Sequence, residues 1–331
     1  MTTSVLVPSF RRPPSLEACL RALARQTVAP GEVIVVWQGD DAPTRDLADR
    51  MALELPLTIR VVHLPEPGIV PAENAALDRA TGQIILLIDD DAVAPVDWLE
   101  RHLAHYADLA IGAVGGPAVN YHANGVQHPE RAVEPFGRIT WYGRLIGNMY
   151  NHPPAWRSRP PRDVDHLVGY NMSLRREAFD RFEASLRRYW QLFETDACLQ
   201  VRHRGYRVVF DSAIVVDHYQ TIRESAYEPG RGGDLDVKVG NASYNLAFLL
   251  SKHTPGPLRW ARLLYLLGVG TTQAPGPLIV PLTIRRHGSP ALELAVARLA
   301  WGQKRAGWRD GRRAKPRRDS RREIVATHAK S

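Results

Sequence analysis

The sequence predicts an α/β fold built on a mostly parallel, doubly wound sheet. Short apolar segments alternate with stretches of helical period through the first 120 residues. The most apolar of them, residues 84–88, reads Ile-Ile-Leu-Leu-Ile and is typical of a strand buried on both faces. Strands that alternate with helices in this way favour one sheet with helices on both of its faces.

The expected strands lie where β-branched residues gather between turn residues. They are residues 4–8, 32–37, 57–63, 83–88 and 112–120. The expected helices between them are residues 15–26, 71–80 and 96–107. Ser15 is placed to cap the first helix, and Pro71 suits the first turn of the second. Gly82 ends the second helix before the central strand.

The chain becomes less regular after residue 120. Residues 121–165 are rich in Pro, Gly, His, Trp and Tyr without a clear period. Such a long irregular stretch in a compact domain is usually functional or mobile. Beyond it we expect an ordered segment at 169–175, helices at 176–183 and 195–205, and strands at 206–210 and 213–217.

The C-terminal third differs in composition from the rest. Helices are expected at 244–250, 258–267 and 291–301, separated by prolines. Residues 304–331 hold eleven Lys and Arg residues and three acids, so this segment accounts for the whole net charge of +8. We expect it to be disordered. The predicted units are a domain at 1–220, a helical extension at 221–303 and a basic tail at 304–331.

The composition is that of an ordinary soluble protein, with 44% hydrophobic and 24% charged residues. No apolar run approaches the ~18–20 residues of a membrane span, and the first residues lack the features of a signal peptide. Cys19 and Cys198 are the only cysteines, so we expect two small core residues and no disulfide framework or cysteine zinc site. The expected compartment is the cytoplasm.

Three carboxylates, Asp89, Asp90 and Asp91, follow the central strand. Open α/β sheets bind their ligands at this end of their strands. In extended chain Asp89 and Asp91 point to the same side, which suits a hard divalent cation that keeps part of its shell for phosphate oxygens. The alternative is an acidic, solvated turn.

Several short motifs follow one another between residues 4 and 218. They are SVLVPSFRRP at 4–13, EVIVVWQG at 32–39, TGQIILLIDDD at 81–91, GYNMSLRR at 169–176, FETDACL at 193–199, RGY at 204–206 and VVDH at 215–218. In this order and spacing they resemble the family-2 inverting glycosyltransferases. The resemblance implies a GT-A fold, a nucleotide-diphosphate sugar donor, a divalent metal (Mn²⁺ or Mg²⁺) and inversion at the anomeric carbon.

The resemblance also assigns residues to the donor and to the metal. The donor half is residues 1–120, with donor contacts at Pro8, Ser9, Phe10, Arg11, Gln38, Asp40, Asn74, Asp89 and Asp90. Asp91 is the first-choice metal ligand, with Asp89 and His218 beside it. For His218 the alternative is a structural histidine at a strand end.

Inversion requires a base that takes the proton of the acceptor hydroxyl. Glu194 aligns with the basic carboxylate of the family, and Asp196 is the second candidate. Residues two apart on a helix face away from each other, so only one should enter the site, and helix capping is the alternative for both. The acceptor half is residues 121–220. The expected acceptor contacts there are Gly169, Asn171, Trp156 and Trp190, since aromatic faces suit sugar rings, although packing would also explain the aromatic residues.

Two departures from the family and two rival functions accompany this assignment. Gln38 stands near the usual nucleobase-reading Asp, and Glu73 replaces the Arg before Asn74. A sugar nucleotidyltransferase would need a glycine-rich loop after the first strand, which residues 8–13 lack. No nucleic-acid partner is expected, because the chain outside its tail is neutral.

The last prediction is attachment to an anionic membrane surface. An apolar helix face with basic neighbours, followed by a basic tail, is typical of interfacial binding. The apolar residues are Leu258, Trp260, Leu263, Leu264, Leu267, Trp301 and Trp308, and the basic neighbours are Arg259 and Arg262. We accordingly expect a glycan or lipid-linked acceptor. The alternative is an ordinary helical subdomain with a solvated tail.

Overall fold

The structure is a computed structural model that describes residues 1–122, 124–188, 191–220, 235–271, 274–279 and 290–314. Its centre is an eight-stranded sheet in the order β10-β12-β6-β11-β4-β1-β2-β3. In that order the strands are Arg162–Asp163, Arg207–Phe210, Ile111–Gly115, Met172–Arg175, Ile84–Leu87, Thr3–Ser9, Glu32–Gln38 and Ile59–Leu64. β10 and β11 are antiparallel to their neighbours, and the other pairs are parallel. The predicted mostly parallel sheet is confirmed.

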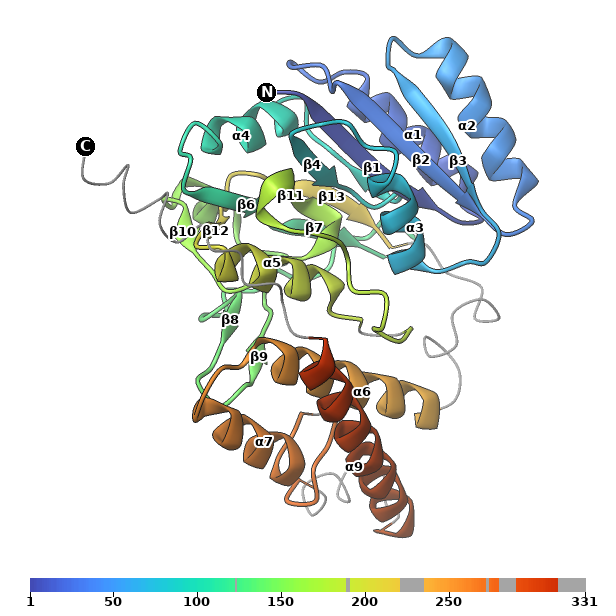
Figure 1. Cartoon of the computed structure of the whole chain (residues 1–331). Helices are drawn as coiled ribbons and strands as arrows, with labels where there is room; N and C mark the ends of the chain where they lie inside the picture. The colour runs from blue at the N-terminus through green and yellow to red at the C-terminus, as the bar shows by residue number, and fades with distance from the viewer. Residues whose placement is uncertain (123, 189–190, 221–234, 272–273, 280–289, 315–331) are drawn as a thin grey trace.

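The unbroken apolar run of β4 is explained by two cores, one on each face of the sheet. Ile84 and Leu86 face a core shared with α1 (Pro13–Leu23), α2 (Ala42–Glu54) and α4 (Trp98–His105). Ile85 and Leu87 face a second core with α3 (Ile69–Leu77) and α5 (Phe193–His203). Figure 1 shows the sheet between these layers. Cys19 and Cys198 are buried as predicted, one in each core.

The elements differ from the prediction in several places. One helix, α2, was missed. The sequence carried two signals for this helix: Asp41 as an N-cap residue and a proline in the first turn. In the structure the Asp41 side chain accepts from the Thr44 amide at 3.2 Å. The helix predicted at 176–183 is wrong beyond a single 3₁₀ turn, η3 (Arg176–Ala178). There the Phe182 amide donates to Asn74 instead of continuing a helix.

The strand predicted at 112–120 is two strands in two sheets. At Gly116 the backbone runs very close to the backbone of Ile214. A side chain at Gly116 would lie 1.8 Å from the carbonyl oxygen of Ile214, so only glycine fits where β6 ends. After Gly116 the chain forms β7 (Ala118–Tyr121), which joins a small sheet in the order β5-β13-β7. Its partners are β5 (Ala92–Val93) and β13 (Val216–Tyr219).

The predicted irregular region holds only short elements. They are β8 (Arg138–Ile139), β9 (Leu145–Ile146), η1 (Pro154–Ser158) and β10, followed by η2 (Gly169–Asn171) before β11. β8 and β9 form a separate antiparallel pair.

The described residues of the C-terminal part include three helices, at the bottom of Figure 1. They are α6 (Leu235–His253), α7 (Leu258–Gly268) and α9 (Pro290–Arg313). α6 and α9 touch backbone to backbone, because a side chain at Gly307 or Gly311 would lie 2.2 Å from the carbonyl oxygen of Tyr244 or Phe248. Two glycines four residues apart on one helix face permit this approach.

The prediction of a disordered tail from residue 304 is wrong for residues 304–313, which are the last turns of α9. The physical reason is burial. Lys304 is fully buried and donates to the carbonyl oxygens of Leu266 at 2.6 Å and Pro275 at 2.8 Å, and burial lowers the pKa of its amine to about 7. Trp308, assigned above to a membrane-facing segment, is buried against α6 and α7. Residues 315–331 lie outside the described residues.

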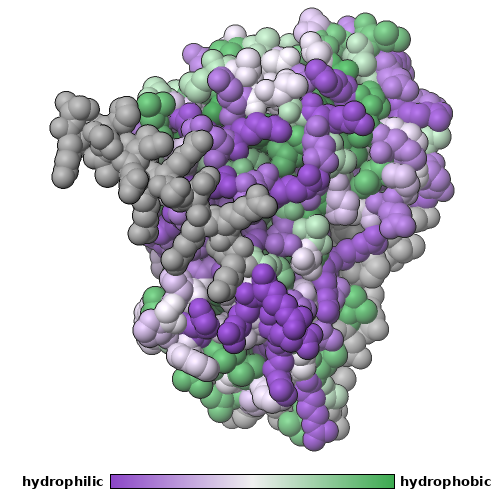
Figure 2. Space-filling model, in the orientation of Figure 1, coloured by the Kyte–Doolittle hydropathy of each residue, from purple (hydrophilic) through white to green (hydrophobic). Residues whose placement is uncertain are grey.

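The surface over the C-terminal end of α9 is strongly hydrophilic, as Figure 2 shows. The last turn of this helix carries Arg312 and Arg313. In the described part of the chain, none of the helices has the length and apolar content that a membrane crossing requires.

Candidate active site

An acidic cluster with one histidine forms where three segments of the chain meet. The antiparallel pairing of β13 with β5 sets His218 opposite Ala92, directly after the three aspartates. Its Nε2 atom lies 3.1 Å from Asp91 Oδ1 and 3.6 Å from Asp89 Oδ2. One ligand atom from each of Asp89, Asp91 and His218 lies within 4.8 Å of the others. The structure therefore brings the three predicted metal ligands together.

The orientation of His218 suits metal binding. The parallel pairing of β13 with β7 places His218 beside Asn120, whose Oδ1 lies 2.9 Å from Nδ1. A hydrogen bond from Nδ1 leaves Nε2 as the ligand atom. Burial alone would lower the pKa of His218, but the Asp91 and Asp89 carboxylates outweigh it and raise that pKa. The two carboxylates are ligands that suit Mn²⁺ and Mg²⁺, and the imidazole is a ligand typical of transition metals.

Sequence reasoning missed Arg12, which neutralises part of this cluster. Its guanidinium forms ion pairs with both Asp90 and Asp91. The contact follows from the sheet, because β1 pairs with β4 and the loop after β1 therefore reaches the aspartates. Two successive arginines in that loop were the available signal.

Asp90, predicted to contact the donor, is fully buried beneath the loop that follows β1. The Ser9 hydroxyl donates to it at 2.6 Å. Burial raises the pKa of Asp90 to about 7 although Arg12 and Ser9 act in the opposite direction. Asp90 thus positions Ser9 and Arg12, and the aspartates available as metal ligands are Asp89 and Asp91.

Residues predicted for the donor divide into accessible and internal groups. Phe10 and Arg11 are partly exposed in the loop after β1, and Arg11 Nη2 lies 3.0 Å from Asp40, which is 84% exposed. Pro8 is buried at the end of β1. Arg11 has a left-handed backbone (φ 54°), a conformation that non-glycine residues adopt mainly where a site requires it.

Gln38 and Asn74 are internal. The Gln38 amide donates to the Ser9 carbonyl at 3.2 Å and accepts from the Gly68 amide at 2.8 Å, so it holds two loops instead of presenting both ends to a nucleobase. Asn74 exchanges two hydrogen bonds with the Phe182 backbone, at 3.0 and 3.2 Å. These contacts give both side chains a structural role.

Glu194 lies in the first turn of α5, and its carboxyl group is mostly buried. The Gly169 amide donates to Glu194 Oε1 at 3.3 Å, and a side chain at Gly169 would meet the carboxyl group at 3.1 Å. The next residue, Tyr170, stacks on His218 with ring centroids 5.3 Å apart. Residues 169–170 therefore connect the candidate base to the candidate metal ligands.

The surroundings of Glu194 favour proton transfer near neutral pH. Burial, with a further contribution from Asp89, raises the pKa of Glu194 to about 7. Glu73 is a second buried acid nearby, and burial together with Asp89 and Glu194 raises its pKa well above the usual range. Its Oε2 atom finds no hydrogen-bond partner within the described part of the chain. Glu73 was noted from the sequence only as a lost arginine, and its approach to Glu194 depends on the packing of α3 against α5.

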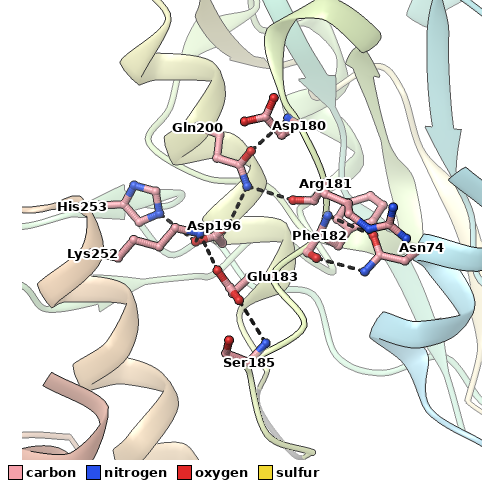
Figure 3. Close-up of polar contacts among 10 residues, drawn as sticks. All are labelled: Asn74, Asp180, Arg181, Phe182, Glu183, Ser185, Asp196, Gln200, Lys252 and His253. Carbon is pink, nitrogen blue, oxygen red and sulfur yellow. Dashed lines mark hydrogen bonds and ion pairs between the residues drawn. The ribbon is translucent and has the colours of Figure 1, made fainter. Parts of the chain in front are cut away.

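Asp196, the second candidate base, is fully buried, and its carboxylate faces Lys252 and His253 (Figure 3). Its carboxylate lies 2.8 Å from Lys252 Nζ and 2.7 Å from His253 Nε2, and Gln200 donates to it at 2.7 Å. Burial alone would raise the pKa of Asp196, but His253 and Lys252 together lower it below its ordinary value. Asp196 therefore joins α5 to α6 and has no open face for an acceptor hydroxyl.

The predicted acceptor residues also prove to be largely internal. Asn171 is fully buried and donates to the carbonyl oxygens of Pro117 at 3.1 Å and Ile214 at 2.8 Å. Trp156 is buried against Phe136 in the core, as in the packing alternative, with Arg159 over its ring at 3.7 Å. Gly169 makes room for Glu194, as described above. Trp190 lies outside the described residues.

Comparisons with known proteins agree with this geometry. Residues 4–182 match a family model described as glycosyl transferase family 2. The succinoglycan biosynthesis protein ExoM of Rhizobium meliloti is 36% identical over 114 residues, 34% of this chain and 37% of the relative. The amylovoran biosynthesis glycosyltransferase AmsE of Erwinia amylovora is 27% identical over 153 residues, 45% of this chain and 57% of the relative. The matches thus span less than two thirds of either relative.

Solved structures show the same fold at low sequence identity. The mannosyltransferase PcManGT of Pyrobaculum calidifontis, in complex with GDP-Man and Mn²⁺, has a TM-score of 0.55 at 19% identity, over 94% of this chain and 84% of that one. TarS 1-349 of S. aureus in complex with UDP has a TM-score of 0.55 at 14% identity, over 95% and 91%. The predicted GT-A fold is confirmed. Since the family model covers more than half of the sequence, the chain belongs to glycosyl transferase family 2.

Proposed function

We propose that the protein is a metal-dependent, inverting glycosyltransferase that moves a sugar from a nucleotide diphosphate to a hydroxyl of a glycan or glycolipid. The observation that carries the proposal is the joining of two groups by residues 169–170. One is the cluster of Asp89, Asp91 and His218, and the other is the Glu194 carboxyl group with its pKa near 7. Relatives named for succinoglycan and amylovoran biosynthesis support a glycan acceptor.

Asp89, Asp91 and His218 would hold Mn²⁺ or Mg²⁺. When bound, such an ion neutralises the diphosphate leaving group without a proton transfer. Arg12 pairs with Asp90 and Asp91, so its positive charge lies beside the carboxylates of the cluster. The protein thus supplies one fixed cation and the ligands for a second.

Glu194 would act as the base. Its carboxylate takes the proton of the acceptor hydroxyl as that oxygen attacks the anomeric carbon from the face opposite the diphosphate. A pKa near 7 leaves about half of the carboxyl groups ionised at neutral pH while keeping them basic enough to accept a proton. Gly169 fixes one carboxyl oxygen through its amide and leaves the other for the acceptor.

A thermal-shift screen of nucleotide sugars, with and without Mn²⁺ or Mg²⁺, tests the donor site. A ligand that binds the folded chain stabilises it by ~2.7 kcal/mol at about one hundred times its dissociation constant. We expect one nucleotide sugar to raise the melting temperature only with metal, and Asp91→Asn to abolish that rise. If no nucleotide sugar or nucleoside diphosphate shifts the wild-type chain in the presence of metal, the proposal is wrong.

We also propose that the C-terminal part binds an anionic membrane surface. On α7, Leu258, Trp260 and Leu264 are 45%, 68% and 73% exposed, which is unusual for large apolar side chains on one short helix. Basic residues of the segment after Ala314 would add electrostatic attraction.

Flotation with vesicles of anionic phospholipid tests this proposal. The shortened variant must end after Ala314, because an earlier end would remove the buried residues of α9. The full chain should float at low salt and less at high salt, and the shortened chain should float poorly. Equal flotation of both chains would show that residues 315–331 are not the anchor.

A further inference from the structure

A cavity of about 740 Å³ lies apart from the acidic cluster, in the C-terminal part of the molecule. Its walls are the end of α5, the end of α6, the connection to α7 and the last turns of α9. None of its lining residues is acidic, and the cationic ones include Lys252, Arg259, Arg305, Arg309, Arg312 and Arg313. The hydrophilic surface over the end of α9 in Figure 2 borders this region.

Most of this positive charge has no counter-charge. Lys252 is paired with Glu183 and Asp196, each at 2.8 Å, and Arg309 with Asp310 at 3.1 Å. For the other four arginines, no carboxylate of the described residues lies within ion-pair distance. By composition, residues 315–331 add further positive charge, with six Lys and Arg residues and two acids. Like charges held this close repel one another unless an anion or solvent intervenes.

His253 gives the cavity a buried polar wall. Its side chain is 1% exposed, and Nε2 donates to Asp196 at 2.7 Å. Among the described residues, its other ring nitrogen, Nδ1, has no hydrogen-bond partner, and neither has Nε of Arg259. Buried polar atoms are rarely left unpaired, so both indicate a partner that the protein itself does not supply. His203 stacks on His253 with ring centroids 5.1 Å apart and fixes its orientation.

We propose that this cavity binds an anion that carries at least two phosphate groups, such as a diphosphate. Guanidinium groups bind phosphate through paired hydrogen bonds, and an imidazole held by a carboxylate can donate its second N–H to the same anion. The volume is within the range of small-molecule sites and exceeds that of one phosphate.

This site is separate from the donor site proposed above and shares no residue with it. The aspartate cluster is acidic and would hold a diphosphate only through a metal ion. The cavity supplies its own cations and needs no metal. Binding without metal therefore distinguishes the two sites.

Titration calorimetry of the full chain with inorganic pyrophosphate, in EDTA at low salt, tests the proposal. We expect saturable binding that is at least about tenfold tighter than that of inorganic phosphate. Arg259→Gln and Arg312→Gln should each weaken it by about tenfold, the loss of one charge-assisted hydrogen bond. Arg50→Gln, on the exposed face of α2, should leave it unchanged. Asp91→Asn should also leave it unchanged, so failure of the donor site would not affect this result.

Flotation on vesicles with phosphatidylglycerol identifies the source of the phosphate. The vesicles for this arm also contain cardiolipin, whose headgroup carries two phosphates, and those with phosphatidylglycerol alone, which carries one, are the control. Flotation that needs cardiolipin and that Arg259→Gln and Arg312→Gln abolish assigns the cavity to a lipid headgroup, whereas pyrophosphate binding without flotation assigns it to a soluble anion. The proposal is overturned if neither probe binds, or if Arg50→Gln weakens binding as much as the two cavity variants do.

Discussion

Replacing Glu194 by Gln should abolish most of the turnover and yet stabilise the folded chain above neutral pH. The ionised carboxylate is disfavoured in its buried position, which raises the pKa of Glu194 from its ordinary value of 4.5 to about 7. The unfolded chain ionises this group near 4.5, so folding costs more free energy as the pH rises from 4.5 to 7. The difference corresponds to roughly 3 kcal/mol above pH 7, at 1.36 kcal/mol for each pKa unit. Gln cannot ionise and avoids that cost.

The same substitution removes the base. Gln keeps the hydrogen bond from the Gly169 amide but cannot accept a proton, so turnover should fall by about 10²–10⁴. In the wild-type chain the ionised fraction of Glu194 rises from about one tenth at pH 6 to about nine tenths at pH 8. Turnover should therefore rise roughly tenfold between these values.

Two assays on each chain check this reasoning. Release of nucleoside diphosphate, from the nucleotide sugar that the thermal-shift screen identifies, measures turnover, and urea unfolding at pH 5 and pH 8 measures stability. The stability gain of Glu194→Gln should be present at pH 8 and small at pH 5. A variant that keeps turnover within threefold, or loses stability at pH 8, would refute the assignment of Glu194 as the base.

Three further predictions concern the metal ligands and the scaffold. Asp91→Asn should keep the fold but lose the metal-dependent shift with donor; an unchanged shift would exclude Asp91 as a ligand. Asp196→Asn should lower the free energy of unfolding by about 3–5 kcal/mol, because it removes a buried carboxylate from the Lys252 ammonium and from the His253 ring. A loss below 1 kcal/mol in urea unfolding would contradict this. Gly311→Ala should lower the melting temperature by forcing α6 and α9 apart at Phe248, whereas Gly302→Ala, where a side chain meets open space, is the matched control; equal melting temperatures would count against the close crossing.

The sheet and the acidic cluster were predictable because their signals are local. The apolar run of β4 and the aspartates that follow it are adjacent in the sequence, and a parallel sheet fixes where such residues lie. Asn120 and Arg12 were not predicted, since their contacts with His218 and the aspartates depend on the pairing of β7 with β13 and of β1 with β4. The pairing of strands that lie far apart in the sequence cannot be predicted from any one segment.

The internal roles of Asp196 and Asn171 escaped sequence reasoning for a related reason. A polar side chain in a functional motif is the same residue type whether it contacts a ligand or holds the fold. Only the partners decide, and those of Asp196 lie on α6, more than fifty residues away. The end of α9 was mistaken for tail because its basic composition masked the spacing of Gly307, Trp308 and Gly311 on one buried face.

The buried amine of Lys304 gives the chain an uneven response to pH. Its pKa is about 7 in the folded state against an ordinary value of 10.5, so the unfolded chain binds more protons between these values and stability rises with pH over that window. Glu194 acts in the opposite direction between pH 4.5 and 7. The penalties for holding a buried ammonium and a buried carboxylate therefore overlap most fully near pH 7. Taken together, these two groups make neutrality the least favourable pH for the fold, at the point where the base becomes half ionised.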